Sequence, residues 1–304
     1  MRVAVLGEPT GWHVGKLLAA FCERGHDAAA VRWSELAAEV TGGGAELFFP
    51  TAIEQAELIV VRGMPGGRLE DLIFRMDLLG RLALRGTPVV NAPQSLEGAI
   101  DKYLSLARLA AVGIPVPRTI VAQDAASIQR AWLSLGGDCI VKPLFGSRGR
   151  GMERLRTPEA IAPLLEAAAE AQPSGAVAYL QEYVPHAGWD VRILLIGNRF
   201  FSIKRISENG DWRTNLARGA RAEAFSPPSA WLDLAHRCAA VLQTEIAGVD
   251  LLPTLDGRLL VLEVNAVPGW RGLEAAVGDD IAASVVHYLE GRLATPPVFA
   301  IKTG

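Results

Sequence analysis

Short apolar segments alternate with amphipathic segments over the first 98 residues of the chain. The runs 3–6, 58–61 and 88–90 are apolar throughout, whereas 14–24 and 69–85 repeat their apolar positions with the period of a helix. An alternation of strands and helices predicts a parallel sheet with helices packed on its faces. We therefore expect residues 1–98 to form a small N-terminal α/β domain, with a loop at 41–44, where a threonine precedes three glycines.

The pattern changes near residue 99, where a second unit begins. A helix at 102–111 should end at Gly113, because the prolines at 115 and 117 favour an extended chain after it. A helix near 124–135, two strands around a glycine-rich turn and a helix at 158–171 would complete a central lobe of residues 99–180. The expected fold class is α/β in the first domain and α+β overall.

Strands dominate the third unit, which we expect to span residues 181–304 together with the strand leading into it. Its strands are predicted at 179–184, 189–196, 199–206, 246–254 and 258–265, and its helices at 229–243 and 278–291. Two pairs of these strands carry hairpin signals. Gly197-Asn198 between two apolar runs predicts a two-residue turn that places Asp190 opposite Arg205.

The second hairpin signal is Asp256-Gly257, which favours a type I′ turn with positive φ at both residues. Leu255 would then face Arg258, and Asp250 would lie directly opposite Glu263 among apolar neighbours. Like charges in this register destabilise a sheet, so the pair calls for compensation. Asn265 lies two residues past Glu263 and therefore on the same face.

Two carboxylates and a carboxamide are oxygen ligands suited to magnesium or manganese, so Asp250, Glu263 and Asn265 form a candidate metal site. Two alternatives remain open at this point. The carboxyl pair could share a proton, or the three residues could lie on an exposed sheet face. A longer loop at Asp256-Gly257 would also change the register.

A lysine precedes a glycine-rich stretch at 139–151, CIVKPLFGSRGRG. Lys142 ends an apolar segment, where an ammonium group is costly unless it meets an anion. The glycines allow backbone N–H groups to approach phosphate oxygens, which favours phosphate binding. The stretch is not a Walker A loop, because no Gly-Lys-Ser/Thr ends it, and a glycine-rich hairpin without a ligand is the alternative.

A strip of basic residues at 192–221 stands out in a chain whose formal net charge is -3. It contains Arg192, Arg199, Lys204, Arg205, Arg213, Arg218 and Arg221, against Glu208 and Asp211. Arginine forks match planar oxygen acceptors, so the strip could neutralise triphosphate and carboxylate groups. A solvated surface strip is the alternative.

Composition narrows the class of protein. With 304 residues, 50% of them hydrophobic, the chain should form two or three lobes. Its slightly acidic charge excludes proteins that coat nucleic acid or anionic membranes. No apolar run is long enough to span a bilayer, and the first one is too short for a signal peptide. Cys22, Cys139 and Cys238 are expected as buried small side chains in a cytoplasmic protein.

Taken together and in this order, the motifs resemble the ATP-grasp superfamily, specifically the RimK-type α-L-glutamate ligases. The matching stretches are DKYLSLARLAAVGIPVPRT (101–119), VKPLFGSRGRGMERL (141–155), QEYVPHAGWDVRILLIGNR (181–199), GDWRTNLARGA (210–220), AGVDLLPT (247–254) and VLEVNAVPGWRGLEAAVGDDIA (261–282). The resemblance covers roughly residues 90–295. The stretches RGMPGG (62–67) and FRMD (74–77) are most similar to the tetrahydromethanopterin glutamate ligase branch.

The resemblance implies an ATP-grasp fold in which ATP lies between two antiparallel sheets, after a small parallel-sheet domain. It assigns phosphate contacts to Lys102 and Lys142, and the nucleotide-side acid to Asp190. The remaining implied ATP contacts are the lid residues Gly146, Ser147, Arg148, Gly149 and Gly151, the adenine segment Gln181, Glu182, Tyr183 and Val184, and the phosphate contacts Arg213 and Asn215. Asp250, Glu263 and Asn265 are the implied magnesium or manganese ligands, and Arg205 and Arg218 the catalytic arginines.

The implied reaction is an ATP-dependent ligation of L-glutamate, through its α-amine, to an acceptor carboxylate by way of an acyl phosphate. Arg62, Arg75 and Arg192 are candidates for binding anionic substrate groups, although a surface position is the alternative for the first two. The expected partners are small molecules and a second copy of the chain, as a dimer or tetramer. A RimK-type reaction on a ribosomal protein tail or peptide, another amino acid as substrate, and a non-catalytic nucleotide-binding regulator are the rival functions.

Overall fold

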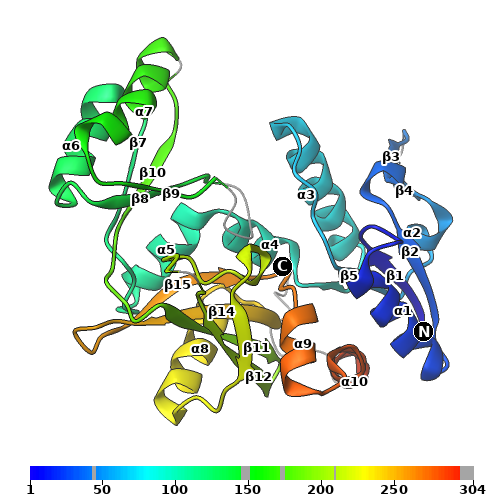
Figure 1. Cartoon of the computed structure of the whole chain (residues 1–304). Helices are drawn as coiled ribbons and strands as arrows, with labels where there is room; N and C mark the ends of the chain where they lie inside the picture. Colours follow the sequence, from blue (N-terminus) through cyan, green and yellow to red (C-terminus); the bar gives the residue numbers. More distant parts are fainter. Residues whose placement is uncertain (43–45, 145–150, 172–174, 209, 295–304) are drawn as a thin grey trace.

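The computed structural model describes residues 1–42, 46–144, 151–171, 175–208 and 210–294. Three parts of the chain are visible in Figure 1: the N-terminal domain (blue to cyan), the central lobe (green) and the C-terminal lobe (yellow to orange). The C-terminal lobe lies beside both of the others.

The N-terminal domain contains the expected parallel sheet, in the order β2-β1-β5-β6. Its strands are β1 (Arg2–Leu6), β2 (Asp27–Val31), β5 (Leu58–Val61) and β6 (Val89–Val90), and its main helices are α1 (Trp12–Glu23) and α3 (Leu69–Leu84). The sequence pattern missed β2, because its three alanines carry little strand signal.

Between β2 and β5 the chain forms elements that were also not predicted: η1 (Trp33–Glu35), a β3–β4 hairpin (Ala37–Val40 and Glu46–Phe49) and α2 (Thr51–Glu54). The loop predicted at 41–44 lies partly outside the described residues, since 43 and 44 are not among them.

The central lobe is an antiparallel sheet in the order β7-β10-β8-β9, with α6 and α7 packed against it. Its elements are β7 (Thr119–Ala122), α6 (Ala125–Ser134), β8 (Cys139–Lys142), β9 (Glu153–Leu155), α7 (Pro158–Glu170) and β10 (Ala178–Glu182). It is preceded by α4 (Pro93–Ile100) and α5 (Lys102–Ala111). Asp101 caps α5 by accepting from the backbone N–H groups of Tyr103 and Leu104, so Lys102 begins that helix.

The C-terminal lobe is a second antiparallel sheet, in the order β13-β12-β11-β14-β15. Its strands are β11 (Trp189–Ile196), β12 (Arg199–Ile206), β13 (Arg221–Ala224), β14 (Ile246–Pro253) and β15 (Leu259–Asn265). The remaining elements are η2 (Leu216–Arg218), α8 (Ser229–Val241), α9 (Arg271–Val277) and α10 (Ile281–Ala294). The sheet positions the side chains of the functional site, because its long strands alternate between two buried faces.

One apolar core joins the N-terminal domain to the C-terminal lobe. It contains Val5 and Leu58 from the parallel sheet, Ile203 from β12 and Val285 from α10, all nearly inaccessible to solvent. Asn91 adds polar contacts across the same boundary, donating to the carbonyls of Ile246 and Ala266 at 2.7 and 2.6 Å. The described part of the central lobe has a separate core between its sheet and its two helices.

Two of the sequence predictions outside the functional site differ from the structure. The helix expected at 278–291 is α10, which begins only at Ile281, and α9 before it was not predicted. Gly278 adopts a left-handed conformation that ends α9. Cys22 is exposed, whereas Cys139 and Cys238 are buried as expected. Among the described residues, no helix is both long and apolar enough to cross a membrane.

The turn predicted at Asp256-Gly257 is also wrong in type. Only Gly257 has positive φ, at +83°. Thr254 donates from its backbone N–H and from its hydroxyl to the Arg258 carbonyl, both at 2.9 Å, which leaves a three-residue connection. Such a loop shifts the register by one residue, as the pairing of Pro253 with Leu259 records. A β-bulge between Asp250 and Leu251 then restores the predicted pairing of Asp250 with Glu263.

The hairpin at Gly197-Asn198 follows its sequence signal. Gly197 has positive φ, as the first central residue of a type II′ turn requires, and Asp190 pairs with Arg205 as predicted. Because this turn is local, the register of both strands depends on residues next to one another in sequence.

Candidate functional site

A cleft of about 90 Å³, open to solvent, lies between the sheet of the central lobe and the sheet of the C-terminal lobe. Twelve of the residues predicted from the sequence line it. They are Lys102, Lys142, Gln181, Glu182, Tyr183, Val184, Asp190, Arg205, Arg213, Asn215, Asp250 and Glu263. Residues from α5, β8, β10, β12, β14 and β15 therefore meet at one place, although they are up to about half the chain apart in sequence.

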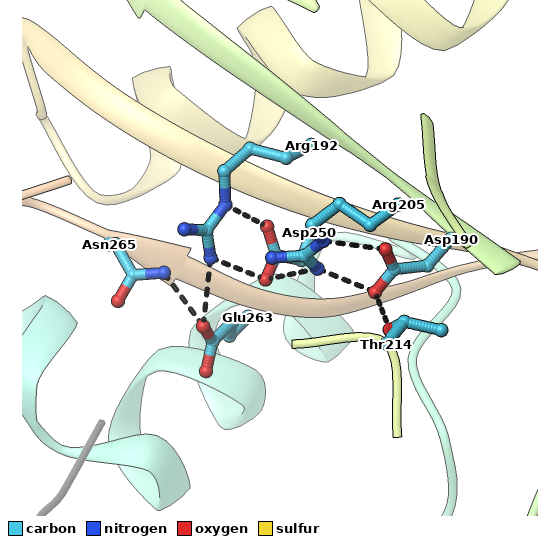
Figure 2. Close-up of polar contacts among 7 residues, drawn as sticks. All are labelled: Asp190, Arg192, Arg205, Thr214, Asp250, Glu263 and Asn265. Atoms are coloured by element: carbon cyan, nitrogen blue, oxygen red, sulfur yellow. Dashed lines mark hydrogen bonds and ion pairs between the residues drawn. The ribbon is translucent and has the colours of Figure 1, made fainter. Parts of the chain in front are cut away.

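Asp250 is one of two nearly inaccessible acids in the cleft and is bound by two arginines (Figure 2). Arg192 donates from Nε and Nη2 to its two oxygens at 2.6 and 2.7 Å, and Arg205 Nη2 lies 2.9 Å from Oδ2. Burial would raise the pKa of Asp250, but the two guanidinium groups outweigh burial and hold the pKa at about 2. Asp250 is therefore ionised across the working range of an enzyme.

Arg205 connects Asp250 to a second buried acid, Asp190. Its Nε and Nη2 donate to the two oxygens of Asp190 at 2.7 and 2.5 Å, and the Thr214 hydroxyl donates to Asp190 at 2.6 Å (Figure 2). Burial alone would lower the pKa of Arg205, but the two carboxylates raise it above its ordinary value. Both oxygens of Asp190 are thus engaged within the protein, which fixes the orientation of Arg205.

Glu263 faces Asp250 across the β14–β15 pair, and protein cations already lie near it. Arg192 Nη2 lies 3.4 Å from Glu263 Oε1, and the Asn265 amide donates to the same oxygen at 2.8 Å. The sequence required a cation between these carboxylates, and the structure places the Arg192 guanidinium there. The register argument could not reveal this, because Arg192 comes from β11, on the other side of β14.

The oxygen donors at this position still fit a hard cation. Glu263 is about one-third exposed, and Asn265 uses its NH₂ group towards Glu263, which leaves its carbonyl oxygen as an acceptor. Carboxylate and carboxamide oxygens suit magnesium or manganese. For Asp250 to coordinate the same cation, Arg192 would have to give up its hydrogen bond to one of the two Asp250 carboxylate oxygens. In the described part of the chain no three His, Cys, Asp or Glu residues cluster as a metal site, so Asn265 is needed to complete the set.

The two lysines lie on the central-lobe side of the cleft. Lys142 donates to the neutral Gln181 amide at 2.6 Å, and Lys102 donates to the Leu144 carbonyl at 3.3 Å. Burial lowers the pKa of Lys142 to about 8 and also lowers the pKa of Lys102. An ammonium group destabilised by burial gains most from an anionic ligand, which is the property that phosphate binding requires.

We expect nucleotide affinity to fall as the pH rises above about 8. Lys142 would bind phosphate in its charged form, so above its pKa of about 8 binding would have to take up a proton. The affinity should then decrease by up to about tenfold per pH unit. Calorimetric titration with a non-hydrolysable ATP analogue between pH 7 and 10 would measure this slope. The matched variant Lys142→Arg keeps its charge and should lose the dependence, whereas an unchanged slope would assign it to another group.

The far end of the cleft has apolar and aromatic walls that the sequence did not reveal. They include Ile140, Met152, Leu252, Leu262, Trp212 and His186. In sequence these residues cannot be distinguished from core positions, because apolar residues in strands occur in both settings. Trp212 packs edge-on to Tyr183 at 6.3 Å between centroids, and the Arg154 guanidinium lies over the Tyr183 ring at 3.1 Å. Such walls suit a flat heteroaromatic base.

Other predicted residues either lie outside the cleft lining or are already paired within the protein. Arg213 lines the cleft but is paired with Asp211 at 3.0 Å, and Arg218 is exposed on η2. Arg75 donates to the Pro65 carbonyl at 2.8 Å. Gly151 ends the glycine-rich stretch and is among the described residues. The predicted lid residues Gly146, Ser147, Arg148 and Gly149 lie outside the described residues.

A family model described as the RimK-like ATP-grasp domain matches residues 99–289. The chain belongs to the RimK-like ATP-grasp family. This RimK-like chain is 27% identical over 269 residues to the tetrahydromethanopterin:alpha-L-glutamate ligase of Methanosarcina acetivorans, covering 79% of the chain and 82% of that relative. It is 34% identical over 229 residues to the ribosomal protein bS6–L-glutamate ligase of Salmonella paratyphi B, covering 74% of each.

The solved structures agree with this assignment. The structure of the ATP-grasp ligase PsnB complexed with a minimal precursor superposes with a TM-score of 0.74 at 25% identity, covering 96% of this chain and 99% of that one. The RimK-like chain therefore has the ATP-grasp fold expected from its motifs. It is an ATP-dependent ligase of the glutamate ligase family, which joins a carboxylate to an amine.

Proposed function

We propose that this ligase adds L-glutamate through its α-amine to the carboxylate of a tetrahydromethanopterin-type cofactor. The observation that carries the ligation chemistry is the charge arrangement of the cleft, where Lys102, Lys142 and Arg205 face Asp250 and Glu263. The relative from Methanosarcina acetivorans, similar over 79% of the chain and 82% of its own length, supports this acceptor.

The nucleotide would lie along the cleft, with its base against the wall formed by Tyr183 and Val184 and its phosphates near the two lysines. Arg213 and Asn215 would contact it from the C-terminal lobe. Magnesium held by Glu263, Asn265 and Asp250 would neutralise phosphate charge and align the terminal phosphoryl group.

The reaction would proceed in two steps. An acceptor carboxylate oxygen attacks the terminal phosphorus of ATP, the bond to the bridging oxygen breaks, and ADP leaves with its electron pair. The α-amine of glutamate then attacks the acyl carbon, inorganic phosphate leaves, and the amine loses a proton. Positioned cations serve both steps, because each builds negative charge on oxygen. Arg205, which lines the cleft, would serve this role together with Arg218.

The test supplies ATP, magnesium and L-glutamate with a tetrahydromethanopterin-type acceptor, and measures both ADP and product mass. A product heavier by one glutamate residue, formed together with ADP, is the expected result. A bacterial relative of the chain acts on ribosomal protein bS6, so a ribosomal protein tail or a peptide is the second candidate acceptor and belongs in the same assay. ADP formed only with a peptide would overturn the pterin acceptor. ADP formed only with another amino acid would overturn glutamate.

A further inference from the structure

Arg62 is a buried cation without an acidic partner in the described part of the chain. It follows β5 at the C-terminal edge of the parallel sheet and is only 9% exposed. Its Nη2 donates to the Pro268 carbonyl at 2.6 Å, and its guanidinium lies 4.4 Å from the centroid of the Trp270 ring. Among the residues that the structure describes, its Nε–H group has no acceptor, and neither does the indole N–H of Trp270.

The contrast with Arg205 shows what Arg62 lacks. Arg205 is similarly buried, but the carboxylates of Asp190 and Asp250 raise its pKa. Burial lowers the pKa of Arg62 to about 9, and no acidic group opposes this effect. A buried charge is costly unless it is paired, so an anion from outside the chain would stabilise this arrangement.

The surroundings of Arg62 hold it in place. Trp270 is buried, its backbone N–H donates to His13 Nε2 at 3.0 Å, and the two rings pack edge-on at 5.0 Å. A cavity of about 10 Å³ lies beside Arg62 and Trp270, close to the smallest volume that holds one water molecule. The guanidinium is thus oriented before any ligand arrives.

Arg62 is also close to the proposed reaction centre. It bonds to Pro268, which is three residues past Asn265, so at most about 11 Å of chain separates the two. Ligands of open α/β sheets bind at the C-terminal ends of the strands, and Arg62 follows such an end. The reacting amine of the substrate has to lie near Glu263 and Asn265. A carboxylate of the same substrate that contacts Arg62 therefore belongs to the end of the molecule that is farther from this amine.

We propose that Arg62, held against the ring of Trp270, binds the side-chain carboxylate of the glutamate substrate. The inference rests on the proposed function and adds the residue that distinguishes glutamate from uncharged amino acids. In glutamate the side-chain carboxylate is the one farther from the α-amine, and a guanidinium with an open N–H matches its planar oxygens.

Binding can be tested with the full chain, magnesium and a non-hydrolysable ATP analogue, followed by calorimetric titration of the amino acid. L-glutamate should bind more tightly than L-glutamine, which lacks only the side-chain charge, by roughly tenfold to a hundredfold. Isoglutamine, which keeps that charge and loses the α-carboxylate, should retain the preference over glutamine. In Arg62→Met the difference between glutamate and glutamine should disappear.

The control Arg2→Met removes an exposed arginine at the opposite end of β1, in the same sheet, and should preserve the glutamate preference. A purely structural Arg62 would predict equal weakening for glutamate and glutamine, which would overturn the proposal. Arg62→Lys keeps the charge and should retain a reduced preference. If Arg62→Met does not fold, the ratio of glutamate to glutamine affinity in Arg62→Lys provides the test of the proposal.

The same titrations separate this inference from the proposed function. A wild-type protein that forms ADP but binds glutamate and glutamine equally well would overturn only the role of Arg62. A wild-type protein that neither binds the nucleotide nor forms ADP would overturn both.

Discussion

Replacing Glu263 with alanine is expected to lower the rate of ADP formation by roughly a thousandfold. A bound cation contributes several kcal/mol to the stabilisation of charge during phosphoryl transfer, and each 1.36 kcal/mol corresponds to tenfold in rate. Of the two acidic ligands proposed for the metal, Glu263 has the weaker competing contacts, since Asp250 is already bound by two arginines. Its side chain is 34% exposed, so the fold should be little affected.

The measurement is a coupled assay of ADP release over a range of magnesium and manganese concentrations, together with the melting temperature. Glu263→Gln keeps the volume of the side chain and should lose activity in the same way. The matched control is Glu223→Ala on β13, another acid of the same sheet that is exposed and lies outside the cleft lining. Near-normal ADP release by Glu263→Ala would remove Glu263 from the metal site.

Arg205→Met is expected to lower the free energy of unfolding by about 3–5 kcal/mol and to abolish ligation. The substitution removes the cation that Asp190 and Asp250 share while leaving both carboxylates buried. Breaking a buried ion pair from one side leaves an uncompensated charge, which is the reason for the large cost. Arg192 would still neutralise Asp250, so Asp190 should account for most of the loss.

Urea unfolding of the wild type and of the variant measures this difference. Arg199→Met makes the same replacement at an exposed position of the same strand and should change stability by less than about 0.5 kcal/mol. The double variant Asp190→Asn with Arg205→Met should recover part of the stability, because it removes the unpaired charge. A loss no larger than that of Arg199→Met would show that the ion pair contributes little.

Local sequence signals determined much of the fold. The helical and strand periods predicted the parallel sheet, and Gly197-Asn198 set the register of β11 and β12. The two antiparallel sheets were implied by the resemblance to the ATP-grasp superfamily. These features depend on residues that are neighbours in sequence, where φ preferences and side-chain alternation act directly. The joint order of the motifs was also sufficient to indicate the ligase family that the comparisons confirm.

The β14–β15 pair shows where local reasoning becomes insufficient. The turn at Gly257 differs from the predicted type, and Asp250 meets Glu263 only because a bulge compensates for the shifted register. A bulge depends on how both strands pack in the sheet, so the residues of the turn do not specify it. The correct pairing therefore followed from an incorrect turn.

The sequence by itself indicated many of the polar residues that line the cleft, some because charged side chains within apolar strands require partners and others through the resemblance to ATP-grasp ligases. Only the tertiary structure decided which partners they have. Arg192 reaches Asp250 and Glu263 from another strand, and Asp190 bonds to Arg205 and Thr214. It also decided that Arg62 is buried without an acid, although the sequence left a surface position open. Burial and pairing depend on contacts between distant segments, and these exist only once the sheets and domains have packed together.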